Sequence, residues 1–361
     1  MRSLLVTGGA GFIGANFVRH WAAARPGDRI VVLDSLTYAG NRANLAGVAA
    51  ELVVGDIRDE ALVDALLAAH AIDTIVHFAA ESHVDRSISG PDAFIETNVV
   101  GTHSLLKAAR RAWLDAPGGR RPHRFHHVST DEVYGTLGPS DPAFREDTPY
   151  QPNSPYSASK AASDHLVRAY HHTYGLEVTT SNCSNNYGPF QFPEKLIPLF
   201  ILNALEGRNL PIYGDGMQVR DWLHVEDHCR GIEAVIERGR VGETYNIGGG
   251  AEMPNLAVID LLCATLDQAF AADPALNARF PGCPAARGEP TASLKTFVTD
   301  RPGHDRRYAI DCSKAMAELG YRPAHDFGSG FAATLRWYLE NEGWWRAVLD
   351  GSYRAGGTST S

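Results

Sequence analysis

The amino-acid sequence predicts a doubly wound, parallel α/β fold with a smaller second lobe of mixed α/β structure. Over the first half of the chain, short apolar runs rich in β-branched residues alternate with longer amphipathic stretches. The runs are nearly all apolar, which is typical of parallel strands covered by helices on both faces. Past residue 182 this alternation gives way to isolated helices between Gly- and Pro-rich loops. A chain of 361 residues is long enough for both parts.

The predicted strands are short and precede the change of pattern. They are Leu4–Val6, Ile30–Leu33, Leu52–Val54, Thr74–Phe78, Phe125–Ser129 and Val178–Ser181. Between them, apolar residues recur at helical spacing, and Asp59 has the character of a helix cap. We therefore predict crossover helices over Asn16–Ala24, Glu60–Ala69 and Val99–Trp113.

The second lobe is predicted from four separate helical patterns. They are Leu196–Leu205, Glu226–Arg238, Leu256–Ala269 and Phe331–Glu340. Residues 271–297, rich in Ala, Pro and Gly, are expected to form a surface excursion. We divide the chain into a sheet domain over 1–182, a lobe mainly over 183–351 with some segments returning to the sheet, and a frayed tail over 352–361.

Composition and charge narrow the classes of partner. The chain has 33 Lys+Arg against 42 Asp+Glu, a formal charge of −9, and no long basic cluster, which argues against nucleic acid as a partner. Apolar runs such as Ile197–Ala204 are far shorter than the ~20 residues that cross a bilayer, so no membrane partner is expected. Five scattered cysteines without a C-x-x-C pair favour reduced thiols and a cytoplasmic protein.

A glycine-rich turn follows the first predicted strand. Thr7–Gly14 places glycines at 8, 11 and 14 directly before a helical stretch, and Asp34 closes the next strand. Gly8 suits a tight turn, Gly11 lets the backbone approach a pyrophosphate, and Gly14 allows close packing of helix on strand. This context predicts a Rossmann-type dinucleotide site. Because a carboxylate at Asp34 repels a 2′-phosphate, it favours NAD over NADP. A turn that binds nothing remains the alternative.

A tyrosine and a lysine lie four residues apart on a predicted helix that begins near Pro155. Tyr156 and Lys160 therefore share one helix face. A neighbouring cation and the charge of a nicotinamide ring favour the phenolate, so Tyr156 is a candidate proton acceptor for oxidation of an alcohol. The same spacing also occurs on ordinary surface helices. The dinucleotide turn upstream makes the catalytic interpretation the better one.

Three polar residues follow the strand Phe125–Ser129, at the edge where parallel sheets bind ligands. Thr130 is placed to hydrogen-bond a substrate alcohol. Asp131 and Glu132 suit elimination of water, which needs one base for a C–H proton and one acid for the departing hydroxyl. The alternative is that Asp131 caps the next turn and Glu132 is solvated.

Longer motifs support a family resemblance over nearly the whole chain. They are Thr7–Gly14, Ala79–Ser87, Ser129–Gly135, Tyr156–Lys160, Asn182–Pro189, Phe192–Pro198 and Asp300–Tyr308. With these motifs the sequence resembles the extended short-chain dehydrogenase/reductase superfamily and, within it, the NAD-dependent sugar-nucleotide 4,6-dehydratases. The resemblance implies dTDP-glucose as substrate, a 4-keto-6-deoxy sugar nucleotide for deoxysugar biosynthesis as product, NAD that is regenerated in each turnover, and a homodimer built from paired helices.

The resemblance also implies residue roles. Tyr156 takes the proton from the glucosyl O4, Glu132 removes the C5 proton, and Asp131 protonates the C6 hydroxyl as it leaves. Lys160 steers the cofactor ribose and lowers the pKa of the tyrosine, and Thr130 holds the sugar. The implied cofactor contacts are Gly8, Gly11, Phe12, Ile13, Gly14, Asp34, Ser35, Leu36, Thr37, Asp56, Ile57, Ala79, Ala80, Thr97, Tyr156, Lys160 and Asn186. The implied substrate contacts are Ser82, Thr130, Asn185, Lys195, Leu196, Pro211, Ile212, Tyr213, Arg220, Asn255, Arg301 and His304.

Other functions were weighed against this one. A nucleotide-sugar 4-epimerase would share the turn and the Tyr–Lys pair but would not need Asp131 and Glu132. A non-catalytic NAD-binding regulator would not need any of these side chains. The histidines near residues 123–127 raise the question of a metal, but neighbouring strand residues point to opposite faces, so no metal site is predicted.

Overall fold

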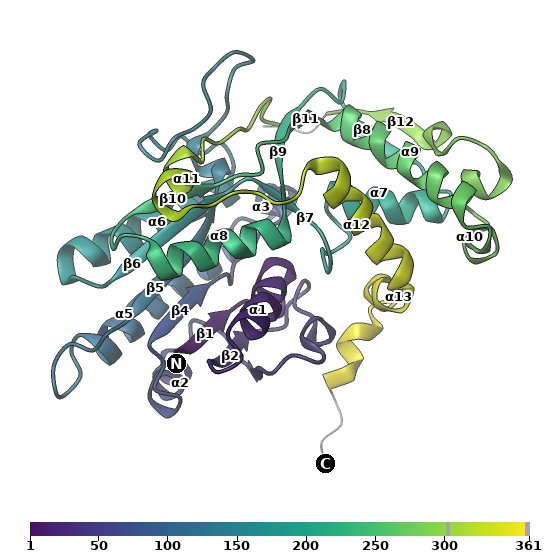
Figure 1. The fold of residues 1–361 in the computed structure, drawn as a ribbon. Helices are drawn as coiled ribbons and strands as arrows, with labels where there is room; N and C mark the ends of the chain where they lie inside the picture. The colour runs from purple at the N-terminus through teal and green to yellow at the C-terminus, as the bar shows by residue number, and fades with distance from the viewer. Residues whose placement is uncertain (301–303, 358–361) are drawn as a thin grey trace.

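The structure is a computed structural model and describes residues 1–300 and 304–357. Its main element is a parallel sheet of seven strands in the order β10-β6-β5-β4-β1-β2-β3 (Figure 1). The six strands predicted from the sequence are confirmed, and β10 is added from the later part of the chain. The strands are β1 (Ser3–Thr7), β2 (Arg29–Asp34), β3 (Glu51–Val54), β4 (Thr74–His77), β5 (Arg124–Thr130), β6 (Val178–Cys183) and β10 (Thr244–Ile247).

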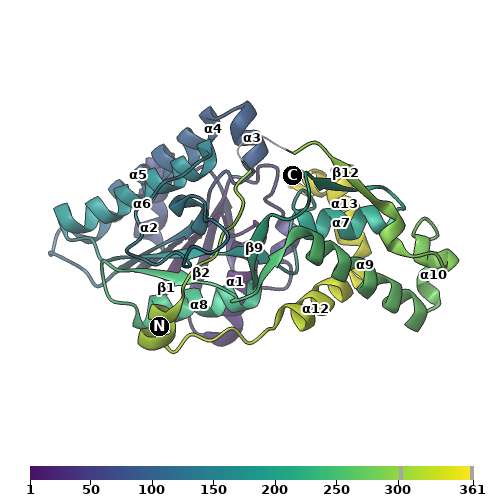
Figure 2. The same ribbon diagram turned by 90° about the horizontal axis from the view of Figure 1, so that it is seen from above.

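Helices cover both faces of this sheet, as the apolar strands predicted (Figure 2). One face carries α1 (Phe12–Ala24) and α8 (Val225–Arg238), and the other carries α2 (Glu60–Ala69), α5 (Thr102–Trp113) and α6 (Pro155–Tyr174). The strand order reverses direction at β1, which pairs with β2 on one side and β4 on the other. Ligands of doubly wound sheets bind at this reversal, at the carboxyl ends of the strands.

Local sequence signals account for where these helices begin. Asp59 caps α2 by accepting a hydrogen bond from the backbone N–H of Leu62, so α2 has the bounds that were predicted. The predicted helix Val99–Trp113 is only the later part of a longer helical stretch. It begins with α4 (Asp92–Phe94) and continues through the π-helix η2 (Ile95–Gly101) before α5.

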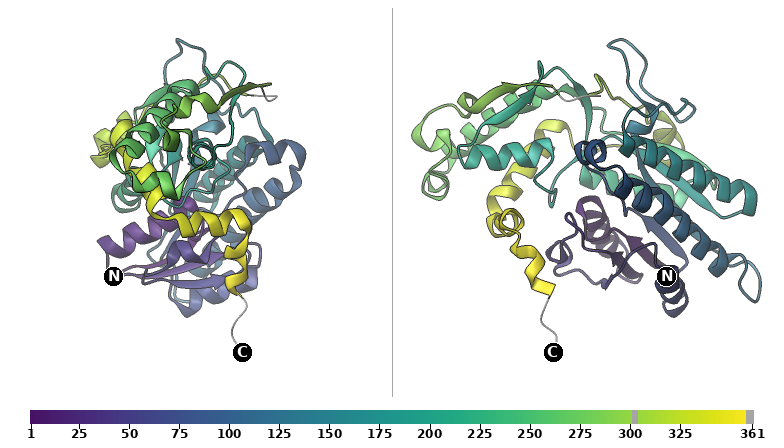
Figure 3. Two further views of the ribbon diagram at one scale, coloured as in Figure 1. Left: turned by 90° about the vertical axis from the view of Figure 1, so that its right-hand side faces the viewer. Right: turned by 180° about the vertical axis from the view of Figure 1, so that it is seen from behind.

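The second lobe is built around the helices α7 (Leu196–Leu205), α9 (Asn255–Ala272) and α12 (Phe327–Glu340), which share one core (Figure 3). Two small sheets complete it. The strands β11 (Glu252–Pro254), β9 (Val219–His224) and β7 (Asn185–Tyr187) form one sheet, and β12 (Lys295–Val298) pairs in parallel with β8 (Leu210–Tyr213). The remaining elements are η1 (Arg42–Leu45), α3 (Val84–Ser89), η3 (Asp131–Tyr134), α10 (Ala275–Arg279), η4 (Pro284–Arg287), η5 (Thr291–Leu294), α11 (Ser313–Leu319), α13 (Glu342–Asp350) and η6 (Ser352–Gly357).

Helix α9 is the one helix in the described ranges that is long and apolar enough, by length and composition, to cross a membrane. Its apolar face packs in the core of the second lobe. Val258, Leu262 and Leu266 on that face are fully buried against neighbouring elements of the lobe. A core helix of a globular lobe accounts for these properties.

The segment 271–297 is not the surface excursion that its composition suggested. It forms α10, η4, η5 and β12, and it sends Leu276, Phe280 and Cys283 into the lobe core. Thr291 donates a hydrogen bond to Asp267 of α9 at 2.6 Å. The prediction was wrong because a few buried side chains anchor the segment to the core, although most of its residues are exposed.

The carboxyl-terminal residues also differ from the frayed tail that was expected. Residues 352–357 form the 3-10 helix η6, and residues 358–361 lie outside the described part of the chain. Tyr353 donates a hydrogen bond to the carbonyl oxygen of Tyr38 and packs near Phe192. The start of the tail is therefore attached to the loop after β2.

Truncation of Phe280 tests whether the 271–297 segment is part of the core. Phe280 is 2% exposed and lies near Phe270 and Trp345. We expect Phe280→Ala to lower the free energy of unfolding by about 3–5 kcal/mol, because it leaves a cavity in a packed core. Urea unfolding measures the change. Phe297→Ala, at a side chain that is 58% exposed, is the matched control and should change it by less than about 0.5 kcal/mol. Equal effects of the two changes would contradict the packing described.

Candidate active site

A cavity of about 660 Å³ opens at the carboxyl ends of the sheet strands and extends to the second lobe. Its size is that of a pocket for a large small-molecule ligand. It is lined by most of the residues that the sequence pointed to. These are Gly8, Gly11, Phe12, Ile13, Gly14, Asp34, Ser35, Thr37, Asp56, Ile57, Ala79, Ala80, Ser82, Thr97, Thr130, Asp131, Glu132, Tyr156, Lys160, Asn185, Asn186, Lys195 and Leu196.

The glycine turn between β1 and α1 has the geometry of a phosphate cradle. Gly8 has φ +69°, in the left-handed region that glycine tolerates. A Cβ at Gly14 would lie 2.3 Å from the carbonyl oxygen of Gly8, so only glycine lets the helix approach the turn this closely. The cap residue Gly11 offers no side-chain hydrogen bond to the first turn of α1. The N–H groups at this helix end are therefore left for an anion.

Asp34 lies at the end of β2, beside the turn. Its two carboxylate oxygens accept hydrogen bonds from the backbone N–H groups of Ala10 at 2.9 Å and Leu36 at 2.8 Å. Burial raises the pKa of Asp34 from its ordinary value, and these two hydrogen bonds oppose the rise. Each oxygen keeps a second lone pair, so the carboxylate suits the ribose hydroxyls of a dinucleotide. With the glycine turn, it makes a donor and acceptor set that fits NAD.

The strand β5 delivers Thr130, Asp131 and Glu132 to the cavity. Thr130 caps the short helix η3, and its hydroxyl accepts a hydrogen bond from the Glu132 N–H at 3.3 Å. Asp131 is 1% exposed, whereas Glu132 is half-buried. Burial, followed by the neighbouring Glu132 and Asp221, raises the pKa of Asp131 well above its usual range. The surroundings of Asp131 therefore favour the protonated form of its carboxyl group.

The second oxygen of Asp131 is a buried polar atom without a partner. Oδ1 accepts from the Thr130 hydroxyl at 3.3 Å, but Oδ2 has no hydrogen-bond partner among the described residues. A buried polar group left without a partner is costly, and such groups in an active site are commonly satisfied by substrate. Because Asp131 lines the cavity, this oxygen is suited to contact a ligand hydroxyl.

The helix α6 presents Tyr156 and Lys160 to the same cavity. Ser154 and Ser157 form a reciprocal capping box, and Pro155 occupies the first turn, so the helix starts one residue before Tyr156. The ammonium of Lys160 donates to the carbonyl oxygen of Val128 on β5 at 2.9 Å. Burial lowers the pKa of Lys160 from its ordinary value.

The pKa of Tyr156 is raised well above its usual value. Burial is the largest cause, followed by the neighbouring Glu132, Cys183 and Asp131 side chains, and a hydrogen bond with Thr130 opposes it. The net shift is opposite to the one expected from Lys160 alone. The sequence places a cation one helical turn away, but it does not reveal that three acidic side chains, two from η3 and one from β6, lie near the phenol.

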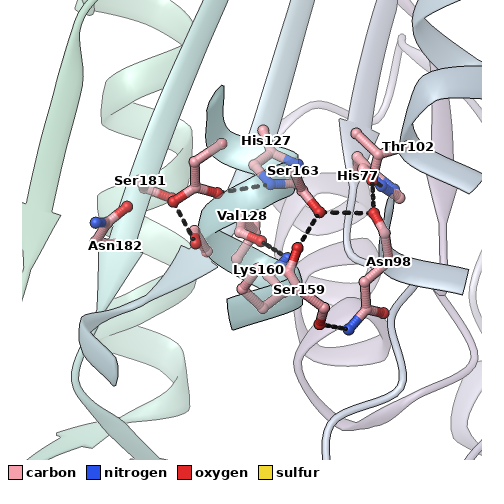
Figure 4. Close-up of polar contacts among 12 residues, drawn as sticks. His77, Asn98, Thr102, His127, Val128, Ser159, Lys160, Ser163, Ser181 and Asn182 are labelled. Carbon is pink, nitrogen blue, oxygen red and sulfur yellow. Dashed lines mark hydrogen bonds and ion pairs between the residues drawn. The ribbon is translucent and has the colours of Figure 1, made fainter. Parts of the chain in front are cut away.

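A second polar network holds α6 against the neighbouring helix (Figure 4). Asn98 donates to the Ser159 hydroxyl at 2.8 Å, and its backbone oxygen accepts from Ser163 and Thr102. Asn98 also pairs with both backbone groups of Glu81, at 2.8 and 3.0 Å. This network joins α6, η2 and the loop after β4, three of the segments that line the cavity.

Some of the expected contacts do not line the cavity. Ile212 is 2% exposed and belongs to the lobe core, so its side chain is not a substrate contact. Arg220 lies close enough to oppose the raised pKa of Asp131, although its guanidinium donates to the carbonyl oxygen of Asp305 at 3.0 Å. Leu36 contributes its N–H to Asp34. Pro211, Tyr213, Asn255 and His304 also lie outside the cavity lining, and Arg301 is outside the described residues.

The cavity contains residues that the sequence reasoning missed. Glu194 lines it and accepts a hydrogen bond from the Tyr38 hydroxyl at 3.1 Å, with Arg86 at 3.4 Å. Arg58 also lines it and pairs with Asp56 at 2.7 Å. The sequence contains a pointer to each residue. Glu194 lies in the Phe192–Pro198 motif, and Arg58 lies two residues after the expected cofactor contact Asp56.

The histidines of β5 have structural partners. His126 lies between the hydroxyls of Thr179 and Ser181, at 3.0 and 3.1 Å, and His123 stacks on Trp113. Among the residues that the structure describes, one other group has ligand atoms within 4.8 Å of one another: His224, Glu226 and His325. The two imidazole rings of that group stack at 4.1 Å, and none of the three lines the cavity.

The fold and the cavity define a class of protein. A dinucleotide turn and a Tyr-x-x-x-Lys helix that face one cavity are the site of a short-chain dehydrogenase/reductase enzyme. The family model described as GDP-mannose 4,6 dehydratase matches residues 5–334. The chain belongs to this family, and the resemblance inferred from the sequence is confirmed.

Relatives and solved structures agree with this assignment. A protein of Xanthomonas campestris pv. campestris named dTDP-glucose 4,6-dehydratase is 59% identical over 359 residues, 98% of each chain. An Escherichia coli protein of the same name is 50% identical over 363 residues, 97% of each. The crystal structure of a dTDP-glucose 4,6-dehydratase from Streptomyces venezuelae, with NAD and TYD bound, has a TM-score of 0.84 and 50% identity over 96% of this chain and 99% of that one. A UDP-glucose 4-epimerase from Thermotoga maritima has a TM-score of 0.80 but 26% identity over 94% and 99%.

Proposed function

We propose that this protein is a dTDP-glucose 4,6-dehydratase that uses NAD and releases water and dTDP-4-keto-6-deoxyglucose. One observation carries the proposal: Asp131 and Glu132 follow Thr130 at the end of β5 and line the same cavity as Tyr156. The two carboxyl groups differ in burial, as an acid and a base in one reaction must. The names of the relatives at 50–59% identity support the same activity.

NAD binding is proposed for the sheet side of the cavity. The turn from Gly8 to Gly14 and the start of α1 would hold the pyrophosphate, and Asp34 would hold the adenosine ribose. Lys160 would hold the nicotinamide ribose. When bound, NAD supplies a cationic ring that accepts a hydride from C4 of the sugar and returns it to C6.

Tyr156 is the proposed proton acceptor for the C4 hydroxyl. Its phenol is buried and hydrogen-bonded with Thr130, so both side chains can reach one substrate oxygen. Burial and the neighbouring acidic side chains oppose ionisation of the phenol, so a cation is required before Tyr156 can hold a negative charge. Lys160 and the cationic cofactor ring are the proposed sources.

Water is then lost from C5 and C6. A ketone at C4 acidifies the C5 hydrogen, and Glu132 is the proposed base that removes that proton. Asp131 is the proposed acid that protonates the C6 hydroxyl as it leaves, because its raised pKa keeps it protonated. The unpartnered Oδ2 of Asp131 fits this role, since the departing hydroxyl needs a donor within hydrogen-bonding reach.

The remaining contacts are proposed for the sugar nucleotide. Ser82, Asn185, Lys195 and Leu196 line the part of the cavity nearest the second lobe, where Lys195 can balance phosphate charge. Arg220, Tyr213, Asn255 and His304 would contact the substrate from beyond the cavity lining, and Arg301 is kept as a proposed substrate contact from the sequence alone. All five cysteines are buried and free, which supports a reducing, cytoplasmic compartment.

A homodimer is also proposed. Three large apolar side chains, Ile88, Ile95 and Val100, are 41–48% exposed on α3 and η2. A helix face of this kind suits pairing with a second copy of the chain. Sedimentation of the purified protein would reveal its oligomeric state.

The activity itself is tested with dTDP-glucose. We expect a product lighter by one water, with the absorbance that a 4-ketone develops in alkali. Mass spectrometry of the nucleotide sugar after incubation measures this. An unchanged mass would exclude the dehydratase, and an unchanged mass with inversion at C4 would identify a 4-epimerase instead.

Glu132→Gln should separate oxidation from elimination. We expect dTDP-glucose still to reduce bound NAD, but loss of water to slow by about 10²–10⁴-fold, because the base for the C5 proton is gone. Absorbance of reduced nicotinamide and product mass, followed together, measure the two steps. Glu226→Gln, at a side chain that is 54% exposed, is the control. Dehydration at the normal rate in Glu132→Gln would overturn the role given to Glu132.

Tyr156→Phe should block the first step. We expect formation of reduced nicotinamide on addition of dTDP-glucose to slow by about 10²–10⁴-fold, because no group then accepts the hydroxyl proton. Stopped-flow absorbance measures the rate. Tyr174→Phe, on the exposed end of the same helix, serves as the matched control. Rapid reduction in Tyr156→Phe would assign the proton acceptor to another residue.

A further inference from the structure

Asp164 continues the row that Tyr156 and Lys160 begin on α6. The three residues are four positions apart, so they lie on one face of the helix in successive turns. They are 9%, 5% and 6% exposed, respectively. Neighbours at this spacing lie within about 5–6 Å at Cβ, which is close enough for strong electrostatic coupling in a buried site.

The carboxylate of Asp164 is held by three donors. Oδ1 accepts from His127 Nε2 at 3.0 Å, and Oδ2 accepts from the hydroxyls of Ser129 at 2.8 Å and Tyr150 at 3.0 Å. His127 and Ser129 point to the same face of β5, because side chains alternate along a strand. Lys160 binds the carbonyl oxygen of Val128, the residue between them (Figure 4). The helix is thereby fixed to the part of β5 that ends at the catalytic residues.

His127 does not neutralise this carboxylate. Complete burial, with Lys160 adding to it, lowers the pKa of His127 well below its usual value, so the imidazole is neutral and donates its Nε2 proton. Nδ1 of His127 has no hydrogen-bond partner among the described residues. This agrees with a neutral imidazole, in which Nε2 carries the proton and Nδ1 carries none. The negative charge of Asp164 is therefore left to act on Lys160.

The other groups around the pair do not replace that charge. Burial raises the pKa of Tyr150 on the preceding loop and of Tyr134 on η3, so both are neutral phenols. Burial likewise raises the pKa of the Cys183 thiol on β6, and it lowers the pKa of His77 on β4 well below its usual value. His165, the next residue on α6, is exposed and adds no negative charge.

We propose that Asp164 is a positioning residue whose carboxylate supplies the counter-charge that keeps Lys160 protonated and directed at β5. This inference deepens the proposed function, since it rests on the roles given there to Lys160 and Tyr156. Without the counter-charge, an ammonium out of contact with water gives up its proton more easily. Tyr156 then loses the cation that supports a negative charge on its oxygen.

The sign of the pH effect follows from this arrangement. Burial lowers the pKa of Lys160, and Asp164 is the first of the groups that oppose the fall. Burial raises the pKa of Asp164 only to about 6, so the carboxylate is ionised at neutral pH and above. Removing its charge lowers the pKa of Lys160 further, so activity is lost at a lower pH on the alkaline side. A nearby unit charge at an effective dielectric constant of about 20 shifts a pKa by on the order of one unit or more.

Two variants separate the charge of Asp164 from its contacts. Asp164→Asn removes the charge and keeps a planar group that can still hydrogen-bond to Ser129 and Tyr150. Tyr150→Phe removes one of the contacts and keeps the charge. Asp164→Glu keeps the charge on a longer side chain. For each purified holoprotein we would measure the NAD content, the unfolding temperature and kcat for dTDP-glucose dehydration between pH 6 and about 10.

The alkaline limb is the part of the pH profile in which kcat falls as the pH rises. We expect Asp164→Asn to move this limb to lower pH by about one unit or more. At a pH within the wild-type limb, kcat of the variant should then be about tenfold lower than that of the wild type. Tyr150→Phe should lower the unfolding temperature and leave the limb in place. Asp164→Glu should return the limb toward the wild-type position, which also tests the proposal if Asp164→Asn does not fold. Superimposable limbs for the wild type and Asp164→Asn, or equal displacement in Tyr150→Phe, would overturn the proposal. A wild-type protein that forms no dehydrated product would instead refute the proposed function.

Discussion

The geometry of the site depends on the fact that parallel strands all end at the same edge of their sheet. The chain uses that edge three times, with the glycine turn after β1, Asp34 at the end of β2 and Thr130 at the end of β5. None of these residues is adjacent in sequence to another, yet all line one cavity. Helix α6 packs against β5 and adds Tyr156 to the same cavity. The glycine turn that would bind the cofactor and the proposed proton acceptor therefore face one cavity.

Burial gives chemically similar side chains different tasks within this cavity. Asp131 and Glu132 are neighbours, but the first is buried beside Asp221 and the second is partly open to the cavity. A carboxyl group that water cannot reach is harder to ionise than one that is partly solvated. Two consecutive acidic residues are therefore suited to different tasks. Both residues lie on the short helix η3, where consecutive side chains point in different directions, so Asp131 is buried and Glu132 is half-buried.

Local patterns in the sequence were sufficient for much of the fold. The Asp59 cap and the helical spacing after it predicted α2 with its observed bounds, and the glycine turn predicted the β1–α1 junction. Contacts between distant segments were not predictable in this way. His127 meets Asp164 across 37 residues, and Ile212 is buried in a core built from α7, α9 and α12, which are far apart in the sequence. Neither residue type nor periodicity specifies such a partner, because burial depends on what packs over a segment.

The comparison with the epimerase shows how little of the structure distinguishes the two activities. A UDP-glucose 4-epimerase has nearly the same fold at 26% identity. Both activities begin with oxidation at C4, so both need a dinucleotide turn and a Tyr–Lys helix. Only elimination needs an acid and a base at C5 and C6, the roles proposed for Asp131 and Glu132 on η3. A carboxyl group held protonated, such as Asp131, would serve no step in a reaction that leaves the C6 hydroxyl in place, yet burying it has a cost. That cost is the physical argument for the dehydratase.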